Sequence, residues 1–255
     1  LPWANLGIWI TSKVVFDKLL SADGSLSVNG GQLAESYSVG ADGMSVSFTL
    51  KDGVTWHDGS ALTVEDVAWS IKTALRVPNI HAVVANTFTS IEGGQAYRDG
   101  EADDISGIAT DGNTITLTMS KLDPNMLLTF TQFAPLPKAH LGDEDPLQLQ
   151  QSSFWQQPIG SGPFRIEEVQ MNDFVRYVPF ENYHGGVAKI DEIIATPSLD
   201  GDGNLLKNAG AGKMDYGFTK NVADVAALEA MDHMRVIPAD IPYTRMIWFN
   251  KFARN

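Results

Sequence analysis

The stretch "GVTWHDGSALTVEDVAWSI", residues 53–71, brings a histidine, an aspartate and an acidic pair close together in the chain. One interpretation is a metal or acid–base site. Metal ligands on a helix must lie one turn apart or return to one face. His57 and Asp58 are adjacent, and so are Glu65 and Asp66, whose side chains would point about 100° apart on a helix. The spacing therefore does not favour a metal or catalytic site.

The same residues fit the start of a helix better. Thr63 is a good N-cap residue, and Asp66 three positions later matches the reciprocal capping box, with aspartate in place of the usual glutamate. Gly59 allows the chain to turn, and Trp56 offers a large side chain for burial. We therefore predict that the stretch is structural and that a helix begins near Thr63.

Hydrophobic periodicity extends this prediction in both directions. The apolar residues of 67–75 recur at helical spacing, and the helix is expected to stop at "RVPN" (76–79), because proline disfavours helix in the residue before it. Apolar and polar residues alternate in 40–53 and again in 112–120, which predicts two half-buried strands.

The remaining segments are shorter and less regular. Their mixture of hairpins and strand–helix–strand units indicates an α/β fold, of mixed α+β type. We predict a helix end and a turn at 16–26, a strand within 158–170 that 173–186 continues as a hairpin ending in a turn, and a short buried strand at 189–197. Further along we predict a helix followed by a short strand at 204–218, a helix at 222–231 and a last strand at 243–250.

Composition excludes several classes of protein. The 255 residues contain no cysteine, which removes disulfides, thiolate metal sites and cysteine nucleophiles. A net charge of −13 argues against nucleic acid and anionic membranes as partners, and it favours a cationic or neutral ligand. No apolar run is long enough to span a membrane. Since the chain opens on "LPWANLGIWI", without a methionine, we expect a processed or cut N-terminus.

The segment 33–71 resembles the signature region of the family 5 extracellular solute-binding proteins, the peptide-, nickel- and glycoside-binding subunits of ABC importers. Ser161 stands where that family usually has threonine, and His184 where it usually has tryptophan. Family members are also much longer, with two lobes. Further matches follow in the family's order: "PIGSGPFRIEE" (158–168), "ENYHGG" (181–186), "KIDEI" (189–193), "AGKMDYG" (211–217) and "IPYTRMIWFN" (241–250).

The resemblance implies a lobe of the type II periplasmic-binding-protein kind, with a mixed sheet flanked by helices and a smaller inserted α+β subdomain. Residues 1–23 and 155–247 would form the hinge-proximal part, 24–154 the inserted subdomain, and 248–255 the start of a crossing to a second lobe. It also implies an extracytoplasmic location, compatible with a lipid anchor upstream of residue 1. The implied ligand is a small solute (a peptide, an oligosaccharide or a metal chelate) held between two lobes, and the implied partner is an ABC permease.

Two segments have the aromatic and neutral hydrogen-bonding groups that such a cleft requires: 1–10 and 128–138. In the resembled family the corresponding segments lie near the cleft. The alternative is that their aromatic residues belong to the core. The candidate ligand-binding residues are Trp3, Asn5, Trp9, Phe130, Gln132 and Phe133, with Arg245 and Trp248 on the last predicted strand.

We expect no catalytic residue, no cofactor and no metal. The loop "DGDGN" (200–204) alternates like a calcium loop, but Leu205 and Ala211 stand where that template needs glycine and glutamate, so we interpret it as a surface turn. Two other functions remain open at this stage: a hydrolase that uses paired carboxylates, and a single-lobe sensory or scaffold module.

Overall fold

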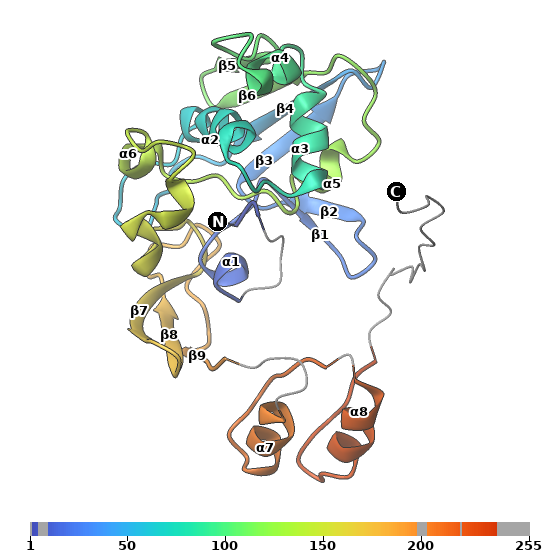
Figure 1. The fold of residues 1–255 in the computed structure, drawn as a ribbon, viewed down its shortest axis with the longest axis vertical. Coiled ribbons are helices and arrows are strands. Elements are labelled where there is room, and N and C mark those ends of the chain that lie inside the picture. Colours follow the sequence, from blue (N-terminus) through green and yellow to red (C-terminus); the bar gives the residue numbers. More distant parts are fainter. Residues whose placement is uncertain (1, 5–9, 198–202, 220, 239–255) are drawn as a thin grey trace, which may run out of the picture. The chain divides into compact units, whose positions relative to one another are not determined.

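In the computed structural model, residues 2–4, 10–197, 203–219 and 221–238 are described (Figure 1). The chain separates into two compact units, Leu1–Thr196 and Pro197–Asn255. The predicted strand at 243–250 lies outside the described residues. The expected division into hinge-proximal and inserted parts follows other boundaries and stays a prediction.

A four-stranded antiparallel sheet is the centre of the first unit, with the strand order β3-β4-β6-β5. The strands predicted in 40–53 and 112–120 are confirmed as β4 and β6. On the polar face of this pair, the hydroxyl groups of Ser47 and Thr116 form a hydrogen bond, with their oxygens 2.8 Å apart. The strands are β3 (Ala34–Val39), β4 (Ser45–Leu50), β5 (Ile108–Asp111) and β6 (Thr114–Thr118).

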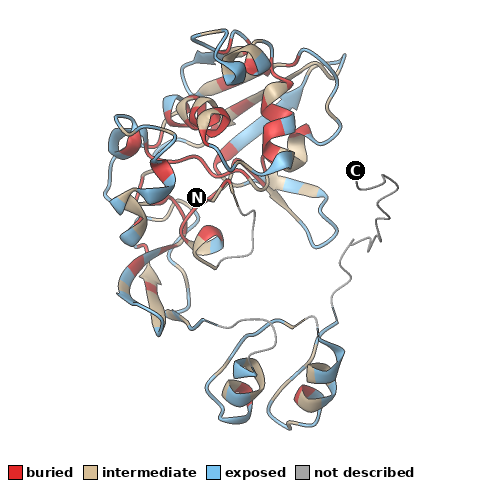
Figure 2. Ribbon diagram, viewed as in Figure 1, coloured by how far each residue is buried: buried red, intermediate tan, exposed pale blue. Residues whose placement is uncertain are grey.

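The predicted helix is α2 (Val64–Arg76), which packs against β5 and β6. Val67, Ile71 and Leu75 are all buried, as their spacing predicted, and the helix ends before Val77 and Pro78. Figure 2 shows buried residues along α2 and along the neighbouring α3 (Ala82–Thr89). Shorter helices complete this region: α4 (Gly94–Asp99), α5 (Met126–Thr129), α6 (Lys138–Leu141) and the 3-10 turns Leu149–Gln151 and Ser153–Gln156.

The start of α2 carries the capping contacts expected from the sequence. Asp66 Oδ2 accepts the Thr63 backbone N–H at 2.9 Å, and Asp66 Oδ1 accepts the Lys138 N–H at 3.0 Å. The carboxylate therefore fixes both the helix start and the entry to α6.

We expect Asp66→Ala to lower the free energy of unfolding by about 1–3 kcal/mol, because two backbone donors lose a buried acceptor. Glu65→Ala is the matched control, since Glu65 is exposed in the same turn. The measurement is the urea midpoint of each variant. Equal midpoints for the two variants would contradict the role given to Asp66.

The helix end predicted at 16–26 is wrong. The helix is α1 (Ile10–Val14), and an antiparallel hairpin of β1 (Leu20–Ala22) and β2 (Val28–Gly31) follows it. Short apolar runs fit a helix or a strand equally well, and here the Leu20 N–H donates to the Phe130 carbonyl at 3.1 Å. The predicted turn is confirmed, because Asp23 Oδ1 accepts the Ser25 N–H at 2.9 Å.

A second antiparallel sheet contains β7 (Phe164–Gln170), β8 (Phe174–Pro179) and β9 (Ile193–Ala195). It confirms the predicted strand and hairpin of 158–186. The strand predicted within 189–197 is present as β9, but the prediction of burial is wrong, because the Ile194 side chain is 55% exposed. The Tyr177 hydroxyl of β8 lies 2.6 Å from Thr11 Oγ1 of α1, which ties this sheet to the N-terminal segment.

The second unit contains α7 (Asn204–Gly210) and α8 (Val222–Glu229), which confirm two predicted helices. The short strand predicted before residue 218 is not formed, and Tyr216 is 81% exposed there. A strand needs a neighbour for its backbone groups, and the described residues supply none at this place. No helix in the described part of the chain is long and apolar enough to cross a membrane.

Candidate functional site

A pocket of about 260 Å³ lies in the first unit, where α1, β1 and the loop after α5 come together. Most of its lining side chains are polar, and the apolar ones are small or aliphatic. The lining residues are Pro2, Ser12, Lys13, Lys18, Leu20, Ser21, Ala22, Gln32, Thr131 and Gln132.

Both sequence segments that we expected to contact a ligand reach this pocket. Gln132 of the segment 128–138 lines it, and so does Pro2 of the segment 1–10. The aromatic candidates lie in the core instead: Trp3, Phe130 and Phe133 are each 0% exposed. Asn5, Trp9, Arg245 and Trp248 lie outside the described residues and stay predictions.

The buried aromatic residues contact one another and the core. Trp3 stacks on Phe133 with ring centroids 5.3 Å apart, and its indole N–H donates to the Ala134 carbonyl at 2.7 Å. The rings of Phe130 and Phe48 of β4 pack with their centroids 4.7 Å apart. These rings expose no surface to a ligand in this structure. They hold in place the segments whose neighbouring residues line the pocket.

Lys18 and Gln32 also line the pocket, although neither is among the residues predicted from the sequence. The Lys18 ammonium donates to the backbone carbonyls of Ser12 and Phe16, at the end of α1. Burial removes water from this ammonium and lowers the pKa of Lys18 to about 8. The available sequence signal was a lysine inside the apolar run "VVFDKLL" (14–20), because a charge in such a run needs partners.

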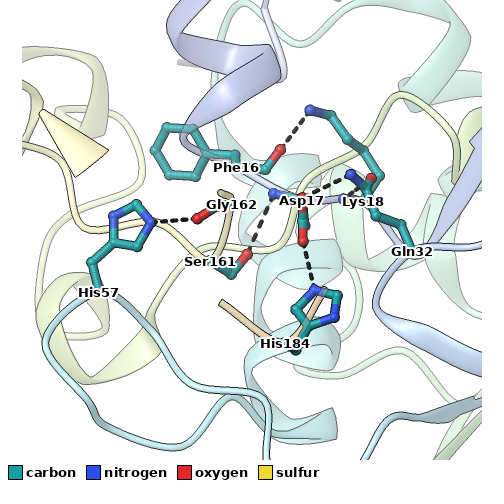
Figure 3. A network of polar contacts seen from close by, with 8 residues as sticks. All are labelled: Phe16, Asp17, Lys18, Gln32, His57, Ser161, Gly162 and His184. Carbon is teal, nitrogen blue, oxygen red and sulfur yellow. Dashed lines mark hydrogen bonds and ion pairs between the residues drawn. The ribbon is translucent and has the colours of Figure 1, made fainter. Parts of the chain in front are cut away.

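A buried polar network holds Lys18 and Gln32 in position (Figure 3). Asp17 is 0% exposed, and its carboxylate accepts hydrogen bonds from Gln32 Nε2 and His184 Nε2, both at 2.7 Å. Gln32 Oε1 in turn accepts the Lys18 backbone N–H at 2.8 Å. The Asp17 N–H also reaches Ser161 Oγ at 3.4 Å. The network therefore sets the orientation of the Gln32 amide beside the pocket.

His57 holds the loop 160–162 in place through hydrogen bonds, which is a structural role. Its backbone N–H donates to the Gly160 carbonyl at 2.8 Å, and its ring Nδ1 accepts the Gly160 N–H at 3.2 Å. The opposite nitrogen, Nε2, is 2.9 Å from the Gly162 carbonyl, so it must carry the proton (Figure 3). Burial lowers the pKa of His57, which favours this neutral form.

The glycines of this loop permit a close approach of two backbones. A Cβ on Gly160 would lie 1.9 Å from the Val15 carbonyl oxygen, and one on Gly162 would lie 2.5 Å from that of Val14. The loop "GSG" (160–162) thus serves backbone packing and is not a phosphate loop.

Asp58 also has structural partners. Its Oδ1 accepts the Ser60 N–H at 2.9 Å, and its Oδ2 lies 2.7 Å from His140 Nε2. Burial raises the pKa of Asp58, but the hydrogen bonds from Ser60 and His140 outweigh that effect and hold it below its usual value. Among the described residues, no group of three or more His, Asp or Glu side chains is placed to bind a metal ion. These contacts favour the structural interpretation of residues 53–71.

Known proteins are similar to this chain over most of its length. Di/tripeptide-binding protein 4 of Pseudomonas aeruginosa is 28% identical over 251 residues, which is 94% of this chain and 46% of that protein. The dipeptide-binding protein of Escherichia coli is 27% identical over 209 residues, 77% of this chain and 37% of that protein.

Solved structures show the same architecture. The Escherichia coli murein tripeptide binding protein MppA matches with a TM-score of 0.72 and 22% identity, covering 90% of this chain and 45% of that one. This chain spans less than half of the length of the relatives that it matches. The model of the bacterial extracellular solute-binding proteins, family 5, middle region, matches residues 30–252. The chain belongs to the family 5 bacterial extracellular solute-binding proteins.

Proposed function

We propose that this chain is one lobe of the substrate-binding component of an ABC importer, which binds a small solute outside the cytoplasm and delivers it to a permease. The match of the family model to residues 30–252 carries the proposal. The named binding activities of the relatives, directed at dipeptides and tripeptides, favour short peptides as ligands. The chain would bind and not transform its ligand.

The pocket beside Gln132 is the ligand-contacting surface of this lobe in the proposal. It offers amide, hydroxyl and ammonium donors next to the aliphatic side chains of Leu20 and Ala22. Such a mixture suits a peptide, whose backbone needs hydrogen bonds and whose side chains need apolar contacts. A second lobe would close over the ligand by a hinge motion, with residues 1–23 and 155–247 next to the hinge and 248–255 leading toward that lobe.

Binding of tri-alanine to the 255-residue chain tests the proposal. We expect saturable chemical-shift changes in NMR spectra, with an affinity weaker than about 1 µM, because one lobe supplies only part of the contacts. Glycerol at the same concentration is the control for unspecific effects. No saturable change with tri-alanine or the corresponding dipeptide would contradict a peptide-binding function.

The same samples test the two other functions. If tri-alanine is cleaved at a rate that one carboxylate substitution abolishes, the chain is a hydrolase and the proposal is wrong. A self-associating chain that ignores all small solutes would favour the single-lobe scaffold module. Sedimentation velocity over a range of chain concentrations measures this, and we expect a monomer.

A further inference from the structure

The charges that line the pocket are all of one sign. Lys13 and Lys18 both line it, and no lining residue in the described part of the chain is an aspartate or glutamate. This is unexpected for a chain with 31 acidic and 18 basic residues. The local charge around the pocket is therefore opposite to the charge of the whole protein.

The Lys18 ammonium has an unused donor. It has three N–H groups, and the carbonyls of Ser12 and Phe16 take two of them. The third has no hydrogen-bond partner among the described residues. These two carbonyls are neutral, so they solvate the ammonium without neutralising its charge.

Nearby charges only partly compensate that of Lys18. Asp17 is the closest carboxylate in sequence and favours the charged ammonium, but its two oxygens already accept hydrogen bonds from Gln32 and His184. Lys13 opposes the charge on Lys18, so the two ammonium groups repel each other. An anion in the pocket would relieve both the repulsion and the loss of water around Lys18.

The pocket volume limits the size of the bound group. About 260 Å³ is slightly below the range of about 300–1,000 Å³ for complete drug-sized ligands. The pocket therefore suits the end of a longer molecule: a carboxylate with one or two attached carbon groups. Leu20, Ala22 and Pro2 offer apolar contacts to such carbons, while Thr131 and Gln132 offer hydrogen bonds.

We propose that this pocket binds the terminal carboxylate of the transported solute, with Lys18 as the charged partner and Lys13 as a second cation. The inference rests on the proposed function and specifies its ligand as an anionic or zwitterionic solute, such as a peptide with a free C-terminus. The ligand then carries an anionic group, which the net charge of the chain alone does not predict, because local charge acts on a bound group more strongly than distant, screened charges.

Four probes of the 255-residue chain test the proposal by NMR titration: tri-alanine, tri-alanine amide, N-acetyl-tri-alanine and glutarate. We expect the amide to bind at least about tenfold more weakly than the free acid, since it lacks the charge-assisted contact with Lys18. Acetylation of the N-terminus is expected to change the affinity less than amidation does.

The outcomes separate this inference from the proposed function. Equal binding of tri-alanine and its amide would retain the peptide function and overturn the carboxylate pocket. Binding of glutarate without any peptide would retain the carboxylate pocket and overturn the peptide function. Binding of none of the four probes would overturn both.

A substitution then locates the contact. In Lys18→Met the side chain keeps its length and loses its charge, and we expect the preference for acid over amide to fall to about one. Lys121→Met is the matched control, because Lys121 is exposed and does not line the pocket. A preference that survives in a folded Lys18→Met variant would place the carboxylate elsewhere. Because the comparison of acid with amide uses the unmodified chain, it stands even if this variant does not fold.

Discussion

We expect Gly160→Ala to lower the free energy of unfolding by about 3 kcal/mol or more, which is at the upper end of the penalties for overpacking. The new Cβ would lie 1.9 Å from the Val15 carbonyl oxygen and 2.8 Å from the Val15 carbonyl carbon. Both blocking atoms are backbone, so no side-chain rotation can relieve the contact. The loop must move away from Val15, and the hydrogen bonds between His57 and Gly160 must lengthen or break.

Gly24→Ala is the matched control for this substitution. Gly24 lies in an exposed turn, and a Cβ there would meet no atom within 4 Å. We expect its urea midpoint to stay within the small range typical of surface substitutions. If Gly160→Ala unfolds at the same urea concentration as Gly24→Ala, the close approach of the Gly160 and Val15 backbones does not make alanine destabilising at this position.

Asp17→Ala has the second large effect, an expected loss of about 2–6 kcal/mol in the free energy of unfolding, because a buried donor left without its acceptor costs about 1–3 kcal/mol and two donors are affected. The Asp17 carboxylate is fully buried and accepts hydrogen bonds from Gln32 and His184. Without it, both donors remain in the interior with no acceptor. His184 is affected most, because its other ring nitrogen, Nδ1, is buried and has no hydrogen-bond partner among the described residues.

A double-mutant cycle with His184→Ala measures the contact itself. We expect a coupling energy of about 0.5–3 kcal/mol between the two positions, because they share a direct hydrogen bond. Asp103→Ala is the control for loss of an acidic residue, since Asp103 is exposed. Strictly additive effects of Asp17→Ala and His184→Ala would show that the pair does not stabilise the fold.

The Asp17 network also connects stability with the candidate site. Gln32 joins Asp17 to the backbone of Lys18, and both Gln32 and Lys18 line the pocket. The chain has thus placed a neutral amide between a buried carboxylate and the pocket. The Asp17 carboxylate is hydrogen-bonded to its own partners, and the Lys18 ammonium keeps one donor without a partner among the described residues.

The sequence by itself determined the elements whose signals are local. The capping residues Thr63 and Asp66, the helical spacing that follows them and the alternation in β4 and β6 each depend on neighbours only a few residues away. Such patterns can be followed without knowing the fold. Local signals failed where a segment was short: residues 16–26 contain the strand β1, whose backbone pairs with β2 and, through the Leu20 N–H, with the carbonyl of the distant Phe130.

Only the tertiary structure decided which polar residues meet. Asp17 and His184 are 167 positions apart, and no spacing rule connects them. The same holds for the pocket, where Lys18, Gln32 and Gln132 come from separate segments. Conversely, Trp3 and Phe133 were predicted to contact a ligand, because aromatic residues occur in ligand sites as well as in cores. Packing buries both rings in the core. The physical reason is that burial and charge neighbours depend on long-range packing, whereas helices and strands begin with local hydrogen bonds.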